Sequence, residues 1–401
     1  MGASTESSRP RGAAIGIMAI AGIAMALGTI QPGMAMLFGV YSDVPMTTIM
    51  YIISLPSLTC LIGTFIAGII AGRFIKYRTL ALLAGIVWVI TGVLPGFVYG
   101  FEVLLVTRCI YTFAMGMLMP LYNPLINALY SEDKQARMLS IATFVAYGGT
   151  MVLQLVGGFL ADIQWNFIFF THFLGVIAVV LMIFVPEPPK EAMTERKKTE
   201  KGALPARVVV MGVFFAVMGL CMMPVLFNYS VLVAAIDDSV AVAATVQLFY
   251  SIGCMVGGLL FATFFKLFKR FTIGVAALLV AVGQLLLVMS GNVPLMCAAM
   301  FVAGFGYCMI MPAVLHIAGL VTKPSLLPFA TSIIMILMNV TSFIATPFIT
   351  MVAGFAGGDA IFAPIWTCII IVAVLAVATL VVNPFPKSAS AEQSEAVDKA
   401  A

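Results

Sequence analysis

Charged residues are scarce in this sequence. Only 9% of its 401 residues are Asp, Glu, Lys or Arg, and 63% are hydrophobic. A soluble domain carries about 25% charged residues, so this composition excludes an ordinary soluble protein. Apolar runs of roughly 20 residues, long enough to cross a hydrocarbon core about 30 Å thick, recur along the whole chain. We therefore predict an all-α polytopic membrane protein.

The sequence also lacks the motifs of enzymes and ATP-driven pumps. It has no glycine-rich phosphate loop with a lysine and no nucleophile–base pair in a suitable context. All seven cysteines fall inside apolar runs and lack the spacing of a zinc site, so we expect no metal and no cofactor. The basic residues form short loop clusters instead of one continuous face, and we expect no nucleic-acid partner.

Hydropathy and loop signals together predict twelve transmembrane helices. The first apolar run is longer than the core of a signal peptide, about 7–15 residues, so we interpret it as a retained helix. We expect two six-helix bundles at 1–185 and 208–383, a cytoplasmic linker at 186–207 and a cytoplasmic tail at 384–401. The predicted spans are 13–39, 47–71, 79–99, 103–129, 138–161, 166–185, 208–235, 242–265, 272–290, 294–320, 328–353 and 361–383.

Basic residues are distributed unevenly among the predicted loops. With twelve spans, all but one of the 20 Lys and Arg residues fall on one side, and the opposite loops carry only acids. Loops rich in Lys and Arg stay in the cytoplasm. Both termini are therefore predicted to be cytoplasmic, in a cell inner membrane. The exception is Arg108, which lies inside a predicted span.

Prolines suggest that the two halves are repeats. Pro32 and Pro224 are predicted to interrupt the opening span of each half, and Pro120 and Pro312 the fourth span. Both pairs are 192 residues apart. In transporters built from repeats, the substrate site lies near the midplane between the halves, and alternating access follows from rocking.

Arg108 has two possible roles. A charged side chain at the bilayer centre costs at least about 2.5–3.5 kcal/mol, so it needs a partner or a wet cavity. None of the 16 Asp and Glu residues lies deep in a predicted span, and Glu102 and Asp43 are the nearest acids by sequence. The guanidinium could bind freed carbonyls of a bent helix, or it could pair with an anionic substrate. The sequence leaves both roles open.

Several stretches resemble the major facilitator superfamily of secondary transporters. Residues 68–78 are similar to the family's loop motif after the second helix, with Gly72 in place of the usual aspartate and Arg73 among the basic residues. Arg108 stands where the fourth helix of the family commonly carries an arginine. Residues 157–158, both glycine, resemble the end of its fifth helix. The resemblance implies two pseudo-symmetric bundles that work by alternating access.

Neutral polar side chains inside the spans are candidate substrate ligands. In the first half we select Gln31, Tyr111 and Gln154 beside Arg108; Tyr111 shares the face of Arg108 at i+3. In the second half the resemblance places five more on helices that line the cavity. These are Asn228, Gln247, Tyr250, Tyr307 and Asn339. The alternative for each residue is an ordinary interhelical hydrogen bond, worth well under about 2 kcal/mol.

Coupling and gating need titratable or charged groups in or near the membrane. We select His316, Asp43 and Glu102 as coupling candidates and Arg73 as a gating candidate, with a proton as the candidate ion. His316 lies four residues beyond Pro312, so it could instead bond a carbonyl that the proline frees. His172, in a span that is peripheral in the family, is interpreted as structural.

The favoured function is secondary transport of a small organic anion or carboxylate by a monomer in the lipid bilayer. One alternative is efflux of hydrophobic drugs, which the 27 Met and 30 Phe residues favour. The resemblance weakens that alternative, because Leu153 and Gln154 stand where drug antiporters of the family carry Gly-Pro. A membrane sensor that does not transport is a second alternative. We expect no enzymatic activity.

Overall fold

The structure is a computed structural model that describes residues 12–187, 204–322 and 326–382. Those residues form helices and turns and contain no β-strand. Their contacts divide the chain into two compact units, Met1–Arg196 and Lys197–Ala401. Most of the predicted linker and all of the predicted tail lie outside the described residues.

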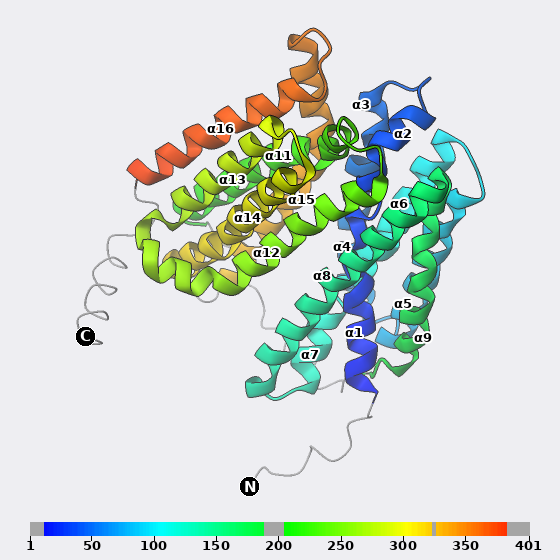
Figure 1. Cartoon of the computed structure of the whole chain (residues 1–401). Helices are drawn as coiled ribbons and strands as arrows, with labels where there is room; N and C mark the ends of the chain where they lie inside the picture. Colours follow the sequence, from blue (N-terminus) through cyan, green and yellow to red (C-terminus); the bar gives the residue numbers. More distant parts are fainter. Residues whose placement is uncertain (1–11, 188–203, 323–325, 383–401) are drawn as a thin grey trace. The chain divides into compact units, whose positions relative to one another are not determined.

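The first unit (blue to green in Figure 1) contains long helices joined by short 3₁₀ segments. Pro32, Pro95 and Pro120 lie at or beside helix breaks in this unit. The elements are α1 Ala13–Ala24, η2 Ala26–Gly28, η3 Gln31–Gly33, α2 Met34–Val40, α3 Met46–Ile49, α4 Tyr51–Ile70, α5 Tyr77–Val93, η4 Leu94–Gly96, α6 Phe101–Leu118, α7 Tyr122–Leu129, α8 Glu132–Ile163, η5 Trp165–Leu174, α9 Gly175–Leu181 and η6 Met182–Phe184.

The second unit (green to red in Figure 1) has longer and more regular helices. Its elements are α11 Ala206–Ala234, α12 Val240–Phe268, η7 Lys269–Phe271, α13 Thr272–Met289, α14 Val293–Val321, α15 Leu327–Phe355 and α16 Phe362–Val381. Pro224 lies inside α11 and Pro312 inside α14, and both helices continue past them. The prediction that these prolines interrupt their spans is therefore wrong for the second half.

Among the described residues, ten helical segments are long and apolar enough to cross a membrane. One bent pair, Ala13–Ala24 with Ala26–Val40, adds an eleventh span. The segment Val240–Met289 contains two helices, α12 and α13, because the backbone turns at Lys269 with φ +46°. With α12 and α13 counted separately there are twelve spans, which agrees with the predicted fold class.

Glycines bring several helix pairs into backbone contact, among them one pair in each unit that contains at least two such glycines. In the first unit, a Cβ atom at Gly63 or Gly116 would collide with a backbone carbonyl of the partner helix in the α4–α6 pair. In the second unit, Gly253 and Gly304 are placed in the same way between α12 and α14. Small residues let membrane helices approach closely. These contacts fix the position of α6, the helix that carries Arg108.

Candidate functional site

The first predicted span is a broken helix. α1 ends at Ala24, and two 3₁₀ turns separate it from α2, with a bend of 44° between the two parts. Pro32 has no N–H to donate, and Gly28 and Gly33 on either side favour non-helical backbone. The break leaves carbonyl groups without partners inside their own helix, and in a membrane such groups must be bonded by other parts of the protein.

Three side chains from two other helices donate hydrogen bonds to consecutive carbonyls of this break. Two of them come from α6 and one from α8. The bonds join Tyr111 Oη to the Ala26 carbonyl at 2.9 Å, Arg108 Nη2 to the Leu27 carbonyl at 2.9 Å, and Gln154 Nε2 to the Gly28 carbonyl at 3.0 Å. Each of the three consecutive carbonyls at the break, from Ala26 to Gly28, is therefore bonded by a side chain of another helix.

A fourth contact fixes the next residue of the break. Thr29 Oγ1 lies 3.3 Å from Nε2 of His172, and Nδ1 of the same ring lies 2.8 Å from the Phe169 carbonyl. Because a carbonyl only accepts, Nδ1 carries the proton and Nε2 accepts from the threonine hydroxyl. His172 is fully buried and packs edge-on against the rings of Trp88 and Tyr111. These contacts support the structural interpretation of this histidine.

The guanidinium of Arg108 is only partly bonded. Its side chain is 1% exposed, and its Cζ lies 4.5 Å from the centre of the Tyr111 ring. Nη2 bonds Leu27, whereas Nε and Nη1 have no hydrogen-bond partner in the described part of the chain. The buried polar and charged side chains of that part include no Asp or Glu. Arg108 is thus a buried cation with two unpaired donor nitrogens.

The four candidate ligands of the first half meet at the break. Gln31 is the first residue of η3 and is 8% exposed. A Cβ atom on Gly28 would lie 2.7 Å from Gln31 Oε1 and 3.2 Å from Gln154 Nε2, so both amides close around this glycine. The side chains of Arg108 and Tyr111 reach the preceding two residues. The structure therefore places the four around one short segment.

The candidate ligands of the second half are more dispersed. Asn228 is fully buried and donates to the Ala360 carbonyl at 3.3 Å. Tyr307 is 8% exposed and its ring stacks on that of Phe215, with the centres 6.0 Å apart. Both residues are therefore already engaged in interhelical packing within the second unit.

The other second-half candidates make fewer defined contacts. Gln247 is buried, and its Oε1 has no hydrogen-bond partner among the described residues. Tyr250 is half-buried on the same helix, α12. Asn339 belongs to α15, but its side chain lies outside the described residues.

Sequence analysis missed Gln284, a fully buried residue of α13. Its Nε2 donates to the Cys221 carbonyl at 2.9 Å, and that carbonyl lies three residues before Pro224 in α11. A proline in a helix weakens the backbone hydrogen bonds of the preceding turn. In the sequence, the signal for this contact was a single amide in the otherwise apolar span of α13, together with Pro224 in α11.

The coupling and gating candidates lie outside the buried cluster. Asp43, Glu102 and Arg73 are all exposed. His316 is exposed on α14, and its ring packs edge-on against Phe265 with the centres 5.1 Å apart. Within the described residues, no acid shares the burial of Arg108.

Comparison of the sequence with models of known protein families identifies the family of this chain. A model described as Major Facilitator Superfamily matches residues 12–236 and 209–400. The chain belongs to this superfamily and is a multi-pass secondary transporter that works by alternating access. Its family and fold are those of transporters, not of enzymes. A comparison with curated protein sequences gave no match.

Solved structures of transporters share the fold over nearly the whole chain. The nucleoside transporter NupG is 13% identical with a TM-score of 0.73, and the match covers 92% of this chain and 96% of that chain. A D-xylose-proton symporter is 17% identical with a TM-score of 0.70, covering 94% and 97%. A bacterial homolog of the human lysosomal transporter Spinster is 13% identical with a TM-score of 0.67, covering 94% and 93%. At these identities the likeness concerns the fold alone.

Proposed function

We propose that this transporter moves a small organic anion and that Arg108 binds the anionic group. The supporting observation is the incomplete bonding of the Arg108 guanidinium, which has two unpaired nitrogens and no buried acid beside it in the described part of the chain. A charge that is removed from water without a partner is costly. A carboxylate or similar group would neutralise the cation and accept hydrogen bonds from the unpaired nitrogens.

The structural and the substrate-binding roles of Arg108 are compatible. Nη2 holds the Leu27 carbonyl at the helix break, and Nε and Nη1 are left for a ligand. Ligand binding would then act on the same segment that Tyr111 and Gln154 hold. This connection gives the substrate a direct means of favouring one arrangement of the broken helix.

Efflux of hydrophobic drugs is the competing function. A buried guanidinium without a counter-charge repels a cationic compound, and a neutral apolar compound leaves the unpaired nitrogens unsatisfied. Arg108 therefore favours an anion over both kinds of drug, and drug transport is one outcome of the experiment below.

We propose a proton as the coupling ion, with His316, Asp43 and Glu102 as candidate carriers, and Arg73 as a gating residue. Uptake driven by an imposed pH gradient, and its loss in His316→Gln, would test this proposal.

We also propose a monomer in a cell inner membrane with both termini cytoplasmic. A C-terminal reporter that is active only in the cytoplasm tests the orientation, and the mass of the purified protein tests the oligomeric state.

The substitution Arg108→Gln tests the substrate class. The glutamine amide can still donate to the Leu27 carbonyl, but the positive charge is lost. Hydrogen bonds to charged groups contribute about 1.5–3 kcal/mol, so we expect anion affinity to fall about 10- to 100-fold. The measurement is uptake into proteoliposomes for carboxylates, neutral sugars and cationic drugs, after a thermal-shift screen has selected a substrate.

Gln284→Met is the matched control, because it removes a side chain that bonds a backbone carbonyl but keeps the charge of Arg108. We expect this variant to keep anion affinity within about fivefold of the unmodified protein, since a neutral hydrogen bond contributes about 1 kcal/mol. Unchanged anion uptake in Arg108→Gln, or uptake of drugs but not of anions by the unmodified protein, would disprove the proposal.

A further inference from the structure

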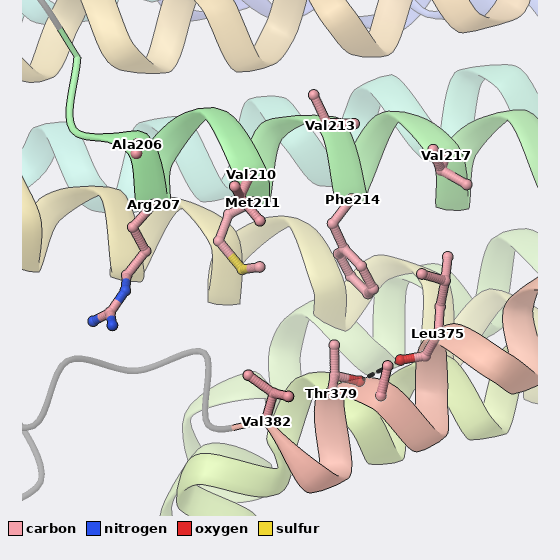
Figure 2. A pocket seen from close by; sticks show the side chains of 11 residues that line it. Ala206, Arg207, Val210, Met211, Val213, Phe214, Val217, Leu375, Thr379 and Val382 are labelled. Carbon is pink, nitrogen blue, oxygen red and sulfur yellow. Dashed lines mark hydrogen bonds between the residues drawn. The ribbon is translucent and has the colours of Figure 1, made fainter.

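A groove of about 650 Å³ lies between α11 and α16 of the second unit. Figure 2 shows the 11 side chains that line it. Met211 and Phe214 are buried and point from α11 toward the end of α16. Val210 and Val213, at 59% and 48% exposure, form the outer part of the wall. The groove is therefore open to the surroundings of the second unit.

The lining of the groove is apolar apart from one charged end. Thr379, in the wall from α16, donates its hydroxyl to the Leu375 carbonyl at 2.8 Å and also lies 3.0 Å from the Ala376 carbonyl, so it offers no free donor. Arg207, in the first turn of α11, extends away from the apolar residues at one end (Figure 2). In the described part of the chain, no acid forms an ion pair with Arg207. The groove thus combines a long apolar wall with a single cation.

The position of the groove determines what surrounds it. α11 and α16 are both long and apolar enough to cross a membrane, so we expect the exposed wall residues Val210 and Val213 to face acyl chains. Arg207 lies where α11 begins, at the end predicted to be cytoplasmic, which is the depth of lipid headgroups. Basic groups at this side of a membrane attract anionic lipid, each contributing about 1 kcal/mol.

We propose that this groove is a binding site for one anionic glycerophospholipid. Its acyl chain lies along Val210, Phe214 and Val217, and its phosphate pairs with Arg207. Charge complementarity selects the anionic headgroup, since a zwitterionic lipid presents its own cation to the guanidinium. The proposal is independent of the transported substrate, because it concerns residues of the second unit that the anion proposal does not use.

The test is lipid binding to the full, purified and delipidated protein. Native mass spectrometry would compare phosphatidylglycerol with phosphatidylcholine of the same acyl chains. We expect the anionic lipid to bind about fivefold more tightly, and Arg207→Gln to remove that preference. Lys266→Gln is the matched control, because it removes an exposed cation of α12 outside the groove, and we expect it to keep the preference.

A second variant tests the apolar wall. Ala378→Trp fills the groove without changing the charge, and we expect binding of both lipids at this site to fall by fivefold or more. Equal binding of the two lipids by the unmodified protein would overturn the proposal. Equal losses in Arg207→Gln and Lys266→Gln would do the same, by showing general surface attraction. Stabilisation by inorganic phosphate to the same extent as by phosphatidylglycerol would also overturn it, by showing a free-anion site.

Discussion

The two halves place prolines at equivalent positions but fold differently around them. In the first unit, Pro32 and Pro120 lie at breaks between helical segments. In the second, Pro224 and Pro312 lie within helices of 29 residues each. A proline alone therefore does not break a membrane helix. The neighbouring residues decide whether it does.

The neighbours of the first proline pair explain one difference. Pro32 lies between Gly28 and Gly33, which leave the backbone free to depart from the helix, whereas the four residues on either side of Pro224 include no glycine. Apolar helix formers around Pro224 keep the helix intact, and one amide from Gln284 bonds a carbonyl near it.

The second proline pair has a different cause. Pro120 is followed four residues later by Pro124, so the Pro120 carbonyl cannot receive its usual helical hydrogen bond. Pro312 has no second proline at that distance, and α14 continues to Val321. Equivalent proline positions in the two halves thus have different local structures. In the first unit, the charged side chain of Arg108 bonds a carbonyl at the break that contains Pro32.

The largest expected contrast between the halves concerns substrate affinity. Arg108→Gln should lower anion affinity about 10- to 100-fold because it removes the charge, whereas Gln284→Met removes a neutral side chain that bonds a backbone carbonyl and should leave anion affinity within about fivefold. Uptake of the selected anion into proteoliposomes measures both. Equal losses in the two variants would mean that the charge of Arg108 is not what the substrate recognises.

A smaller contrast concerns one glycine in each half. Gly28→Ala places a methyl group 2.7 Å from Gln31 Oε1, so both glutamines must move and the Gln154 bond is weakened; we expect a loss of about 1–3 kcal/mol in unfolding free energy. Gly219→Ala in α11 meets only Thr341 Oγ1 and Tyr307 Oη, each at 3.2 Å, and should cost less. Denaturant unfolding in detergent measures both. A larger loss for Gly219→Ala would contradict this account.

The smallest expected effect concerns the hydrogen bond between Thr29, at the helix break, and His172. Thr29→Val keeps the shape of the side chain but removes the hydroxyl that faces His172, leaving a buried ring nitrogen without its donor. We expect the unfolding free energy to fall by about 1 kcal/mol, with anion affinity unchanged. An unchanged thermal midpoint would show that this hydrogen bond contributes nothing.

The sequence predicted the features that depend on composition along the chain. Apolar runs and loop charges predicted the helical class and the span count, and Arg108 stood out because no other Lys or Arg lies in a predicted span. The partners of Arg108 could not be predicted. Leu27 precedes it by 81 residues and offers only a backbone carbonyl, a group that every residue has. Only the fold determines which carbonyl becomes free and which side chain reaches it.

Two further features, the helix breaks at prolines and the contact of Gln284, could not be predicted from single sequence positions. The prolines predicted breaks in both halves, but Pro32 has neighbouring glycines that permit a break, whereas apolar helix formers surround Pro224. The contact of Gln284 with α11 could not be predicted, because an amide in an apolar span usually forms an ordinary interhelical hydrogen bond whose partner the sequence does not specify. Its relation to α11 becomes visible only when α13 is packed against that helix.

The glycine contacts of α4 with α6 have a mechanical consequence. Where two backbones touch, sliding or turning of either helix would push a carbonyl into a Cα atom of the other, so we expect the pair to move as a single rod. Arg108 is carried on that rod, while the segment it bonds is a short link between α1 and α2. If the anion proposed above displaces Arg108, we expect α4 and α6 to move with it and the hydrogen bonds at residues 26 and 27 to pull on the link between α1 and α2.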